Sequence, residues 1–193
     1  MATETVPWQT GAWSTPPADV AVDGDHLLVT ARESSDLWRT TSYGFVHDDG
    51  HALLVPFADQ TAVEVSFLLD FDQQFDQAGL LVRADARNWI KAGVEACDGF
   101  PQVGAVVTRE LSDWSTAPFP EWQGKEVTMR ASRAGDALTV RAHAGGAWQL
   151  VRLAPLDPTL DWSAGPLCCS PSRAGLQVRF TRFAIGPADL SVH

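Results

Sequence analysis

The chain has 193 residues, a net charge of −10 and a pI near 4.7. This length suits one folded unit, so we expect a single domain over 1–193 with a core spanning about 5–187. The acidic charge repels phosphate backbones and anionic lipids, which excludes nucleic acid and membranes as expected partners. The sequence shows neither a signal peptide nor an apolar stretch of about 20 residues, so we expect a soluble, cytoplasmic protein.

Eleven segments have strand character, and turn sequences such as VDGD, HDDG and CDGF separate them. They cover residues 26–31, 41–46, 51–57, 62–70, 77–85, 88–96, 103–109, 125–132, 137–143, 147–154 and 176–186. No long segment keeps the apolar period of a helix. Because a single open sheet of so many strands would curl or split, we predict an all-β fold: a two-sheet antiparallel jelly-roll sandwich.

Residues 125–151 are typical of a three-stranded meander with one apolar side. The alternating apolar positions are Val127 and Met129, then Leu138 and Val140, then Trp148 and Leu150. Side chains at alternate strand positions share a face. We therefore expect all six of these side chains to face the core.

Residues 75–99 show the same alternation in two consecutive strands. The even positions are apolar: Ala78, Leu80, Val82 and Ala84, then Ile90, Ala92, Val94 and Ala96. If the two strands pair as a hairpin, odd positions must face odd positions. One such register places Gln77 opposite Glu95 and Arg83 opposite Trp89, an arrangement that allows a cation–π contact.

The odd positions form a polar face, to which the preceding strand 62–70 adds two more polar side chains, Glu64 and Ser66. The face is expected to carry Glu64, Gln77, Arg83, Trp89, Lys91 and Glu95. A solvated sheet surface alternates in this way too. However, Gly79 and Gly93 lie on the same face, where glycine weakens a strand but permits close approach of a ligand or another backbone. A binding groove is therefore favoured over a plain surface.

Several motifs together resemble a bacterial and fungal family of domains of unknown function with the concanavalin A-like lectin/glucanase fold. They are SDLWRTTSYGFVHDDGHALL (35–54), FDQAGLLVRAD (75–85), NWIKAGVE (88–95), SDWS (112–115) and GPLCCSP (165–171). The resemblance implies a jelly roll whose concave sheet binds glycans in better-known relatives. A yeast member of the family is described as a regulator of enolase, which implies a possible protein partner. The resemblance transfers no catalytic residues.

Glu64 and Glu95 are the best pair of carboxyl groups for glycoside hydrolysis, which needs two carboxyls at a defined separation. The Glu-x-Asp-x-x-Glu strand of the glucanase branch is missing. Arg83 and Lys91 also favour ionised carboxylates and oppose a general acid. Hydrolysis by Glu64 and Glu95 is therefore disfavoured, and the same two cations could instead hold an anionic substrate such as a uronate or a phosphorylated metabolite.

Four further side chains are candidates for the edge of the groove. Asp113 and Trp114 follow a predicted strand, where Trp114 could stack on a sugar ring and Asp113 could accept its hydroxyls. Trp38 and Tyr43 flank Arg39. Each of these residues is equally compatible with a turn or with the core.

Metal and thiol chemistry is weakly indicated. His47 and His51 bracket a turn without a third ligand, so we expect solvent-exposed histidines. Asp70, Asp72 and Asp76 resemble a calcium loop but lack its Gly and terminal Glu. Cys97, Cys168 and Cys169 form no disulfide framework, and buried thiols are favoured over a strained disulfide between neighbours or a soft-metal site. No metal or cofactor is expected.

The leading hypothesis is a protein that binds a carbohydrate or related polar metabolite on its concave face. The expected ligand-binding residues are Trp38, Tyr43, Gln77, Arg83, Trp89, Lys91, Glu95, Asp113 and Trp114. The alternatives are a non-catalytic regulator that contacts a metabolic enzyme and a hydrolase or lyase that uses Glu64 and Glu95. The protein is more readily interpreted as a binding protein than as an enzyme.

Overall fold

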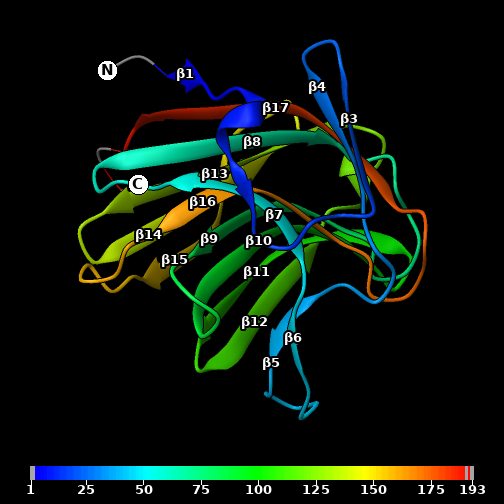
Figure 1. The fold of residues 1–193 in the computed structure, drawn as a ribbon, viewed down its shortest axis with the longest axis horizontal. Coiled ribbons are helices and arrows are strands. Elements are labelled where there is room, and N and C mark those ends of the chain that lie inside the picture. Colours follow the sequence, from blue (N-terminus) through cyan, green and yellow to red (C-terminus); the bar gives the residue numbers. More distant parts are fainter. Residues whose placement is uncertain (1–2, 190, 192–193) are drawn as a thin grey trace.

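A computed structural model describes residues 3–189 and 191. Within these residues, two antiparallel sheets face each other, as the sequence predicted. We call the seven-stranded sheet the front sheet and the eight-stranded sheet the back sheet. In Figure 1 the back sheet lies at the top, the front sheet below it, and a separate hairpin at the bottom.

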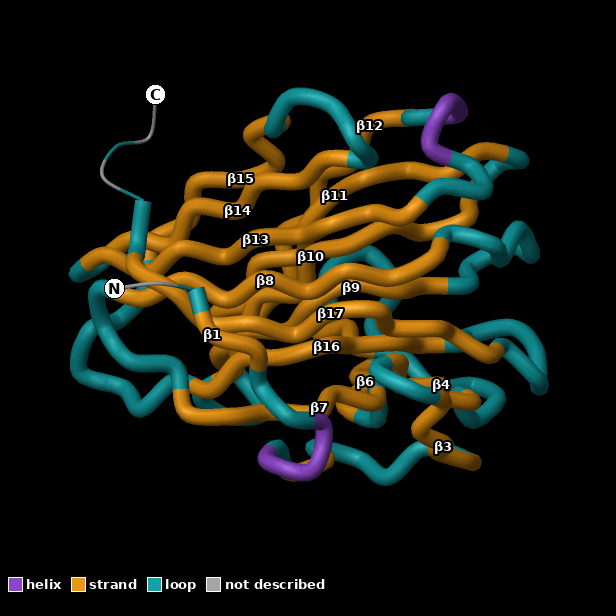
Figure 2. The backbone as a smooth tube through the Cα atoms, turned by 90° about the horizontal axis from the view of Figure 1, so that it is seen from above, coloured by secondary structure: helices purple, strands orange, loops and turns teal. Residues whose placement is uncertain are grey.

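The front sheet contains, in spatial order, β12 (Leu111–Pro118), β11 (Phe100–Arg109), β10 (Asn88–Cys97), β9 (Gln77–Arg83), β16 (Ser163–Cys169), β7 (His51–Pro56) and β2 (Ala12–Trp13). The back sheet contains β15 (Gln149–Pro155), β14 (Ala137–His143), β13 (Glu126–Ala134), β8 (Thr61–Leu68), β17 (Gln177–Pro187), β4 (His26–Thr30) and β3 (Asp19–Asp23), and β1 (Glu4–Thr5) pairs with β17. The hairpin consists of β5 (Leu37–Arg39) and β6 (Val46–Asp48), and two short 3₁₀ helices, η1 (Trp8–Thr10) and η2 (Pro120–Trp122), complete the elements described. Figure 2 shows the strands of both sheets running roughly along one direction.

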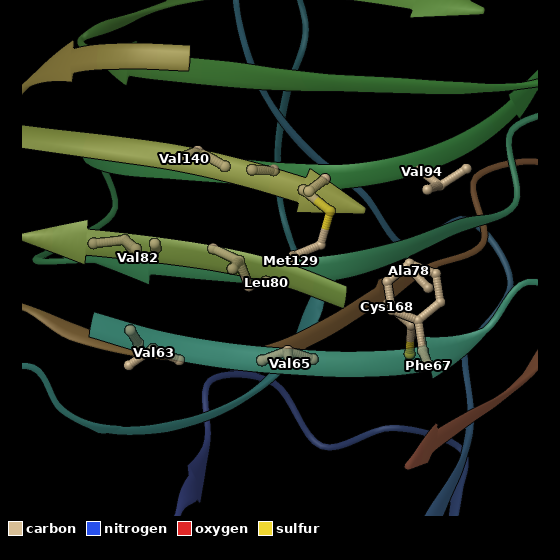
Figure 3. Close-up of a cluster of buried hydrophobic side chains, with 14 of the residues drawn as sticks. Val63, Val65, Phe67, Ala78, Leu80, Val82, Val94, Met129, Val140 and Cys168 are labelled. Carbon is tan, nitrogen blue, oxygen red and sulfur yellow. The ribbon is translucent and has the colours of Figure 1, made fainter. Parts of the chain in front are cut away.

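The main core lies between the two sheets. Its side chains come from alternate positions on facing strands, for example Val63 and Val65 of β8, Leu80 and Val82 of β9, and Met129 of β13 (Figure 3). Burial of such side chains is worth about 25 cal/mol per Å² of apolar surface. The even positions of β9 and β10 face this core as predicted, and only Ala84, beyond the end of β9, is partly exposed.

The register between β9 and β10 also matches the prediction. Gln77 pairs with Glu95 and Arg83 pairs with Trp89. At the next turn, Asp98 and Gly99 adopt φ values of 55° and 84°. A two-residue hairpin turn needs this left-handed backbone, which Asp and Gly tolerate better than other residues.

The segment 41–46, predicted as a strand, is instead the loop of the β5–β6 hairpin over residues 41–45, and only Val46 belongs to a strand, as the first residue of β6. Thr40, Ser42 and Gly44 have φ values of 64°, 66° and 76°, which no strand accommodates. Strands β3, β12 and β16 were also missed. β16 is buried along most of its length, so it lacks the alternation that reveals a strand with one solvated face.

The meander prediction is right in topology but wrong at its last strand. Val127, Met129, Leu138 and Val140 are fully buried, while Trp148 and Leu150 are 41% and 51% exposed. β15 is the edge strand of the back sheet, and its pairing with β14 shifts register at Arg141. An edge strand with an irregularity presents apolar side chains to solvent that periodicity assigns to the core.

His51 is not a solvent-exposed turn residue as predicted, because it is fully buried. Its Nε2 accepts a hydrogen bond from the backbone N–H of Arg32 at 3.0 Å, and Nδ1 lies 3.1 Å from the carbonyl oxygen of Thr15, to which it donates. Burial lowers the pKa of His51. The ring is therefore a neutral structural link between the segments that flank the front sheet.

The three cysteines are free and buried, as favoured from the sequence. Cys168 belongs to the main core, and Cys169 points to the opposite face of β16. Burial raises the pKa of Cys168 to about 12 and that of Cys169 well above its ordinary value. Both thiols are protonated at neutral pH and unreactive.

No helix among the described residues is long and apolar enough to cross a lipid bilayer.

Candidate functional site

A second, smaller buried cluster lies between the outer face of the front sheet and the β5–β6 hairpin. Figure 1 shows this hairpin below the front sheet. Its members are Leu37, Trp38, Ala52, Leu81, Trp89, Val106, Leu167 and Cys169. Trp89 is fully buried in it, and its Nε1 has no hydrogen-bond partner among the residues described. The hairpin therefore covers part of a face that the sequence pattern left open to solvent, and Trp89 is a core residue.

Two ion pairs fasten the hairpin to the sheet. Lys91 Nζ of β10 lies 2.9 Å from Asp36 Oδ1, just before β5. Arg83 binds Asp48 of β6 with both terminal guanidinium nitrogens, Nη1 and Nη2, at 2.5 and 2.9 Å. Such bidentate pairs are geometrically specific. Arg83 thus anchors the hairpin. Trp89, which pairs with Arg83 across the two strands, contributes to packing.

The far strand of the front sheet holds the hairpin from its other side. The backbone N–H of Arg39 donates to Ser112 Oγ at 2.9 Å, and Arg39 Nε donates to the carbonyl oxygen of Glu110 at 3.1 Å. Trp38 Nε1 donates to the carbonyl oxygen of Thr41 at 3.0 Å, within the hairpin loop. The hairpin is therefore anchored to three strands of the front sheet, β9, β10 and β12.

A pocket of about 270 Å³ opens between the hairpin loop and strands β9 to β12, and we call it the hairpin pocket. Its walls are mainly aromatic: Trp38, Tyr43, Phe45, Phe75 and Trp114. Its polar lining consists of Asp36, Gln77, Lys91 and Glu95, and Val106 and Pro171 complete it. An apolar cavity with a few convergent polar groups is the usual form of a small-molecule site.

The aromatic walls are partly organised by contacts among themselves. Tyr43 and Phe45 stack with ring centroids 5.3 Å apart and planes at 10°, and Trp38 meets Tyr43 edge-on at 5.5 Å. Tyr43, Phe45, Phe75 and Trp114 are each at least 40% exposed. Large apolar side chains that gather around one opening, instead of scattering over the surface, mark a contact site.

The floor of the pocket joins three polar side chains from neighbouring strands. Lys91 Nζ donates to Gln77 Oε1 at 2.9 Å as well as to Asp36, which commits two of its three N–H groups. Glu95 lies directly across from Gln77. Among the described residues the Glu95 carboxylate has no hydrogen bond or ion pair, and the Gln77 amide nitrogen donates to none.

Burial and charge act differently on the two ionisable groups of the floor. Burial raises the pKa of Glu95, and the neighbouring Lys91 ammonium only partly opposes this effect. Burial alone would lower the pKa of Lys91, but the charges of Asp36 and Glu95 and the hydrogen bond to Asp36 outweigh it and raise that pKa. Lys91 is therefore charged, and Asp36 neutralises it within the protein. The Glu95 carboxylate has no such partner among the described residues.

The backbone around the pocket is locally strained. Thr40 and Ser42 in the hairpin loop and Phe75 before β9 have φ values of 64°, 66° and 68°. For residues other than Gly this conformation costs about 1 kcal/mol or more and persists where the surroundings enforce it, often at ligand sites. At Phe75 the strained turn directs an aromatic ring into the pocket wall.

Gly79 and Gly93 face each other in the register of β9 and β10. A Cβ at Gly79 would lie 2.1 Å from the carbonyl oxygen of Ala92 and 2.5 Å from the Cα of Gly93. Of the two reasons that the sequence left open, close approach of another backbone is therefore the one that applies. These glycines allow β9 and β10 to approach each other closely at this point.

The prediction that Glu64 shares a face with Glu95 is wrong. Glu64 lies on β8 of the back sheet, where Arg130 binds it at 2.8 Å and Arg182 at 3.4 Å. Strand parity placed Glu64 opposite the core correctly, but it could not say to which sheet β8 belongs. The two carboxyls lie on the outer faces of opposite sheets, so they cannot act on one glycosidic bond.

Asp113 lies outside the hairpin pocket, because it alternates with Trp114 along β12 and binds Arg152 of β15 at 2.9 Å. Of the nine predicted binding residues, the structure brings together six: Trp38, Tyr43, Gln77, Lys91, Glu95 and Trp114. Arg83, Trp89 and Asp113 do not line the pocket. Three polar or aromatic pocket residues were not predicted: Asp36, Phe45 and Phe75. Asp36 and Phe45 lie in the segment 35–54 beside the predicted Trp38 and Tyr43, and this proximity in sequence could have identified them.

Of the candidate calcium ligands, Asp76 is committed to another contact. Asp76 is fully buried and binds Arg173 with both oxygens, at distances from 2.5 to 3.2 Å. Across residues 3–189 and 191, no three His, Cys, Asp or Glu side chains are grouped so as to hold a metal ion.

Comparison with known proteins identifies relatives of this chain. Residues 13–188 match a family described as "Protein of unknown function (DUF1349)". The Saccharomyces cerevisiae protein named "Regulation of enolase protein 1" is 32% identical over 185 residues, which cover 95% of this chain and 93% of the yeast protein.

Two solved structures show how far the likeness extends. A crystal structure of a functionally unknown protein from Saccharomyces cerevisiae superimposes with a TM-score of 0.88 and 32% identity, covering 96% of this chain and all of that one. Lectin I-B4 from Griffonia simplicifolia superimposes with a TM-score of 0.58 and 12% identity, covering 96% and 99% of the two chains. The lectin comparison shows a shared concanavalin A-like sandwich fold.

Proposed function

The chain belongs to the DUF1349 family of proteins of unknown function, and on that premise we propose that it binds a small carbohydrate or a related polar metabolite in the hairpin pocket. The single observation that carries the proposal is the floor of the pocket. It leaves one acceptor, the Glu95 carboxylate, and donors on Gln77 and Lys91 without protein partners among the described residues, next to aromatic walls.

This mixture of free donors and acceptors matches a polyhydroxylated ligand. A hydroxyl group both donates and accepts hydrogen bonds, so neighbouring hydroxyls can donate to Glu95 and accept from the Gln77 amide and from the third N–H of Lys91. Polar groups that are desolvated without partners cost free energy, which a ligand that completes them recovers. The aromatic faces of Tyr43 and Trp114 offer stacking area for the apolar side of a sugar ring.

The size of the pocket favours a small ligand. Its volume of about 270 Å³ lies just under the usual range for drug-sized ligands, about 300 to 1,000 Å³. One sugar ring or the end of a chain suits it better than an extended oligosaccharide buried along its length.

The charges argue against the anionic ligands that Arg83 and Lys91 first suggested. Asp48 neutralises Arg83, and Asp36 neutralises Lys91. Neither cation has an uncompensated charge to offer a uronate or a phosphate, whereas Glu95 would repel one. Neutral or cationic polar metabolites fit the pocket better.

The test is a ligand screen by thermal shift, followed by calorimetry, on the wild-type protein and two tryptophan variants. Trp114→Ala removes a wall of the pocket, whereas Trp148→Ala removes a tryptophan of nearly equal exposure, 41% against 43%, on the back sheet. We expect binding of a neutral or amino monosaccharide that Trp114→Ala weakens at least about tenfold, a typical effect of losing a stacking anchor. Trp148→Ala should leave it unchanged.

Absence of binding across the screen would refute the proposal. Binding that survives Trp114→Ala with undiminished affinity would place the site elsewhere and refute it equally.

A second candidate function is regulation of a metabolic enzyme by direct contact, which the name of the yeast relative suggests. The hairpin presents Tyr43, Phe45 and Val46 to solvent at 44% to 61% exposure. Exposed aromatic side chains of this kind serve as anchors in protein interfaces. Sedimentation velocity with enolase from the same organism, using wild type and Phe45→Ser, tests it: a complex that the substitution disrupts supports a docking role, and independent sedimentation contradicts it.

A further inference from the structure

The charges that line the hairpin pocket do not balance. Among the described residues, three acidic or basic side chains line it: Asp36, Lys91 and Glu95. Asp36 pairs with Lys91 at 2.9 Å. Glu95 is left with no partner. The pocket lining by itself therefore carries one uncompensated negative charge, which a ligand can neutralise.

Glu95 sits where an unpaired charge is costly. Its carboxyl is largely removed from solvent, and burial raises its pKa even though Lys91 is nearby. A ligand hydroxyl can give this carboxylate a hydrogen bond, but it brings no charge. An ammonium group supplies both a hydrogen bond and an opposite charge, so a positively charged nitrogen meets the requirement better.

The aromatic walls point in the same direction. The faces of aromatic rings carry negative electrostatic potential and attract cations within about 6 Å of the centroid. The stacked Tyr43 and Phe45 line the pocket together with Trp38 and Trp114. Aromatic rings around one free carboxylate form the arrangement that recognises organic ammonium groups.

We infer that the ligand of the hairpin pocket carries a positively charged nitrogen, as an amino sugar or a similar hydroxylated amine does, with the ammonium group at Glu95 and hydroxyl groups at Gln77 and Lys91. This inference rests on the proposed function, because it names the class of the polar metabolite that the pocket takes. The net charge of −10 on the chain adds attraction for a cation at long range.

The test uses sugars that differ at one substituent. The probes are the 2-hydroxy, 2-amino and 2-acetamido forms of glucose, galactose and mannose, together with the corresponding uronic acids, measured by calorimetry near neutral pH and low salt. We expect an amino form to bind at least about tenfold more tightly than its hydroxy and acetamido counterparts, a difference of about 1.4 kcal/mol. The uronic acids should bind most weakly.

Glu95→Gln should abolish the preference for the amino form while leaving weak binding of the hydroxy form. Glu110→Gln is the matched control, since Glu110 is a surface glutamate paired with Arg87 outside the pocket. It should preserve both affinity and preference.

The outcomes separate the two claims. If neutral sugars bind as tightly as amino sugars, or if Glu95→Gln keeps the preference, the inference is overturned and the proposed function stands. If no probe of any class binds, the proposed function is overturned and the inference with it.

Discussion

The outer faces of the two sheets carry similar side chains but use them differently. On the back sheet, Arg130 bridges Glu64 and Asp189, and Arg141 and Arg182 supply those carboxylates with second cations. On the front sheet, each of Lys91 and Arg83 has one carboxylate partner, on the hairpin. On the back face, these cations and carboxylates pair with one another in a network. On the front face, both cations pair with carboxylates at the hairpin, and Glu95 has no ion-pair partner among the described residues.

This difference separates a structural surface from a binding surface. Alternating polar residues occur on both faces, so alternation does not distinguish them. A covering element does, because it desolvates the face and sorts its polar groups into those that hold the cover and those that remain available. Glu64 and Glu95 are the same residue type, one fully paired and the other unpaired.

The largest effect is expected at the Lys91–Asp36 ion pair, because within the part of the chain that the structure describes Asp36 has no second cation beside it in an ion pair. Lys91→Met should lower the free energy of unfolding by about 3 kcal/mol, because Asp36 then remains largely buried without a cation. Urea denaturation near neutral pH measures the loss. The double variant Asp36→Asn with Lys91→Met should recover part of it, and a loss below about 1 kcal/mol would show that the pair behaves as an exposed one.

The stability loss of the single variant Lys91→Met should depend on pH. Burial opposes the ionised form of Asp36, but the charge and hydrogen bond of Lys91 lower its pKa overall. A carboxyl whose pKa is lowered in the folded state contributes stability above its ordinary value of 3.8 and loses it as the pH falls through the folded value. Wild type and Lys91→Met should therefore converge in stability as the solution is acidified.

A smaller loss is expected in the back-sheet network. Arg130→Met should cost about 2 kcal/mol, since Arg182 still contacts Glu64 and Arg141 still contacts Asp189. Ligand affinity should not change, because the network lies on the opposite sheet. A loss larger than that of Lys91→Met, measured by the same urea denaturation, would contradict the view that redundancy protects the back face.

Side-chain parity along one strand could be predicted from the sequence, but the arrangement between strands only in part. The pairing of Gln77 with Glu95 followed from the alternation in two neighbouring strands and an odd loop. The position of Glu64 did not, because the chain passes from the back sheet to the front sheet between β8 and β9 and parity carries no information about that crossing.

The pocket itself depended on a segment whose local pattern misleads. Residues 41–46 contain Tyr43 and Phe45 and look like a strand, but the left-handed backbone at Thr40 and Ser42 makes residues 41–45 a loop. Only tertiary contacts, such as the ion pair of Asp48 with Arg83, fold that loop onto the sheet. The sequence therefore located six pocket residues, while the cover that turns their face into a pocket required the structure.

The smallest expected effect concerns Glu95 and has the opposite sign. Burial raises its pKa above the ordinary value of 4.5, so the protonated form is favoured in the folded state and its stabilising contribution is lost as the pH rises through the folded value. Glu95→Gln should thus match wild type in acid and become slightly more stable than wild type toward neutral pH, as thermal melts from about pH 4 to about pH 8 would show.

Asp85→Asn is the matched control of opposite sign: hydrogen bonds from the backbone of Arg87 and the side chain of Asn88 lower the pKa of Asp85, so this variant should lose stability at neutral pH. A Glu95→Gln variant that is instead less stable than wild type at neutral pH would mean that the carboxylate already has a partner in the free protein, and the contrast with Glu64 would disappear.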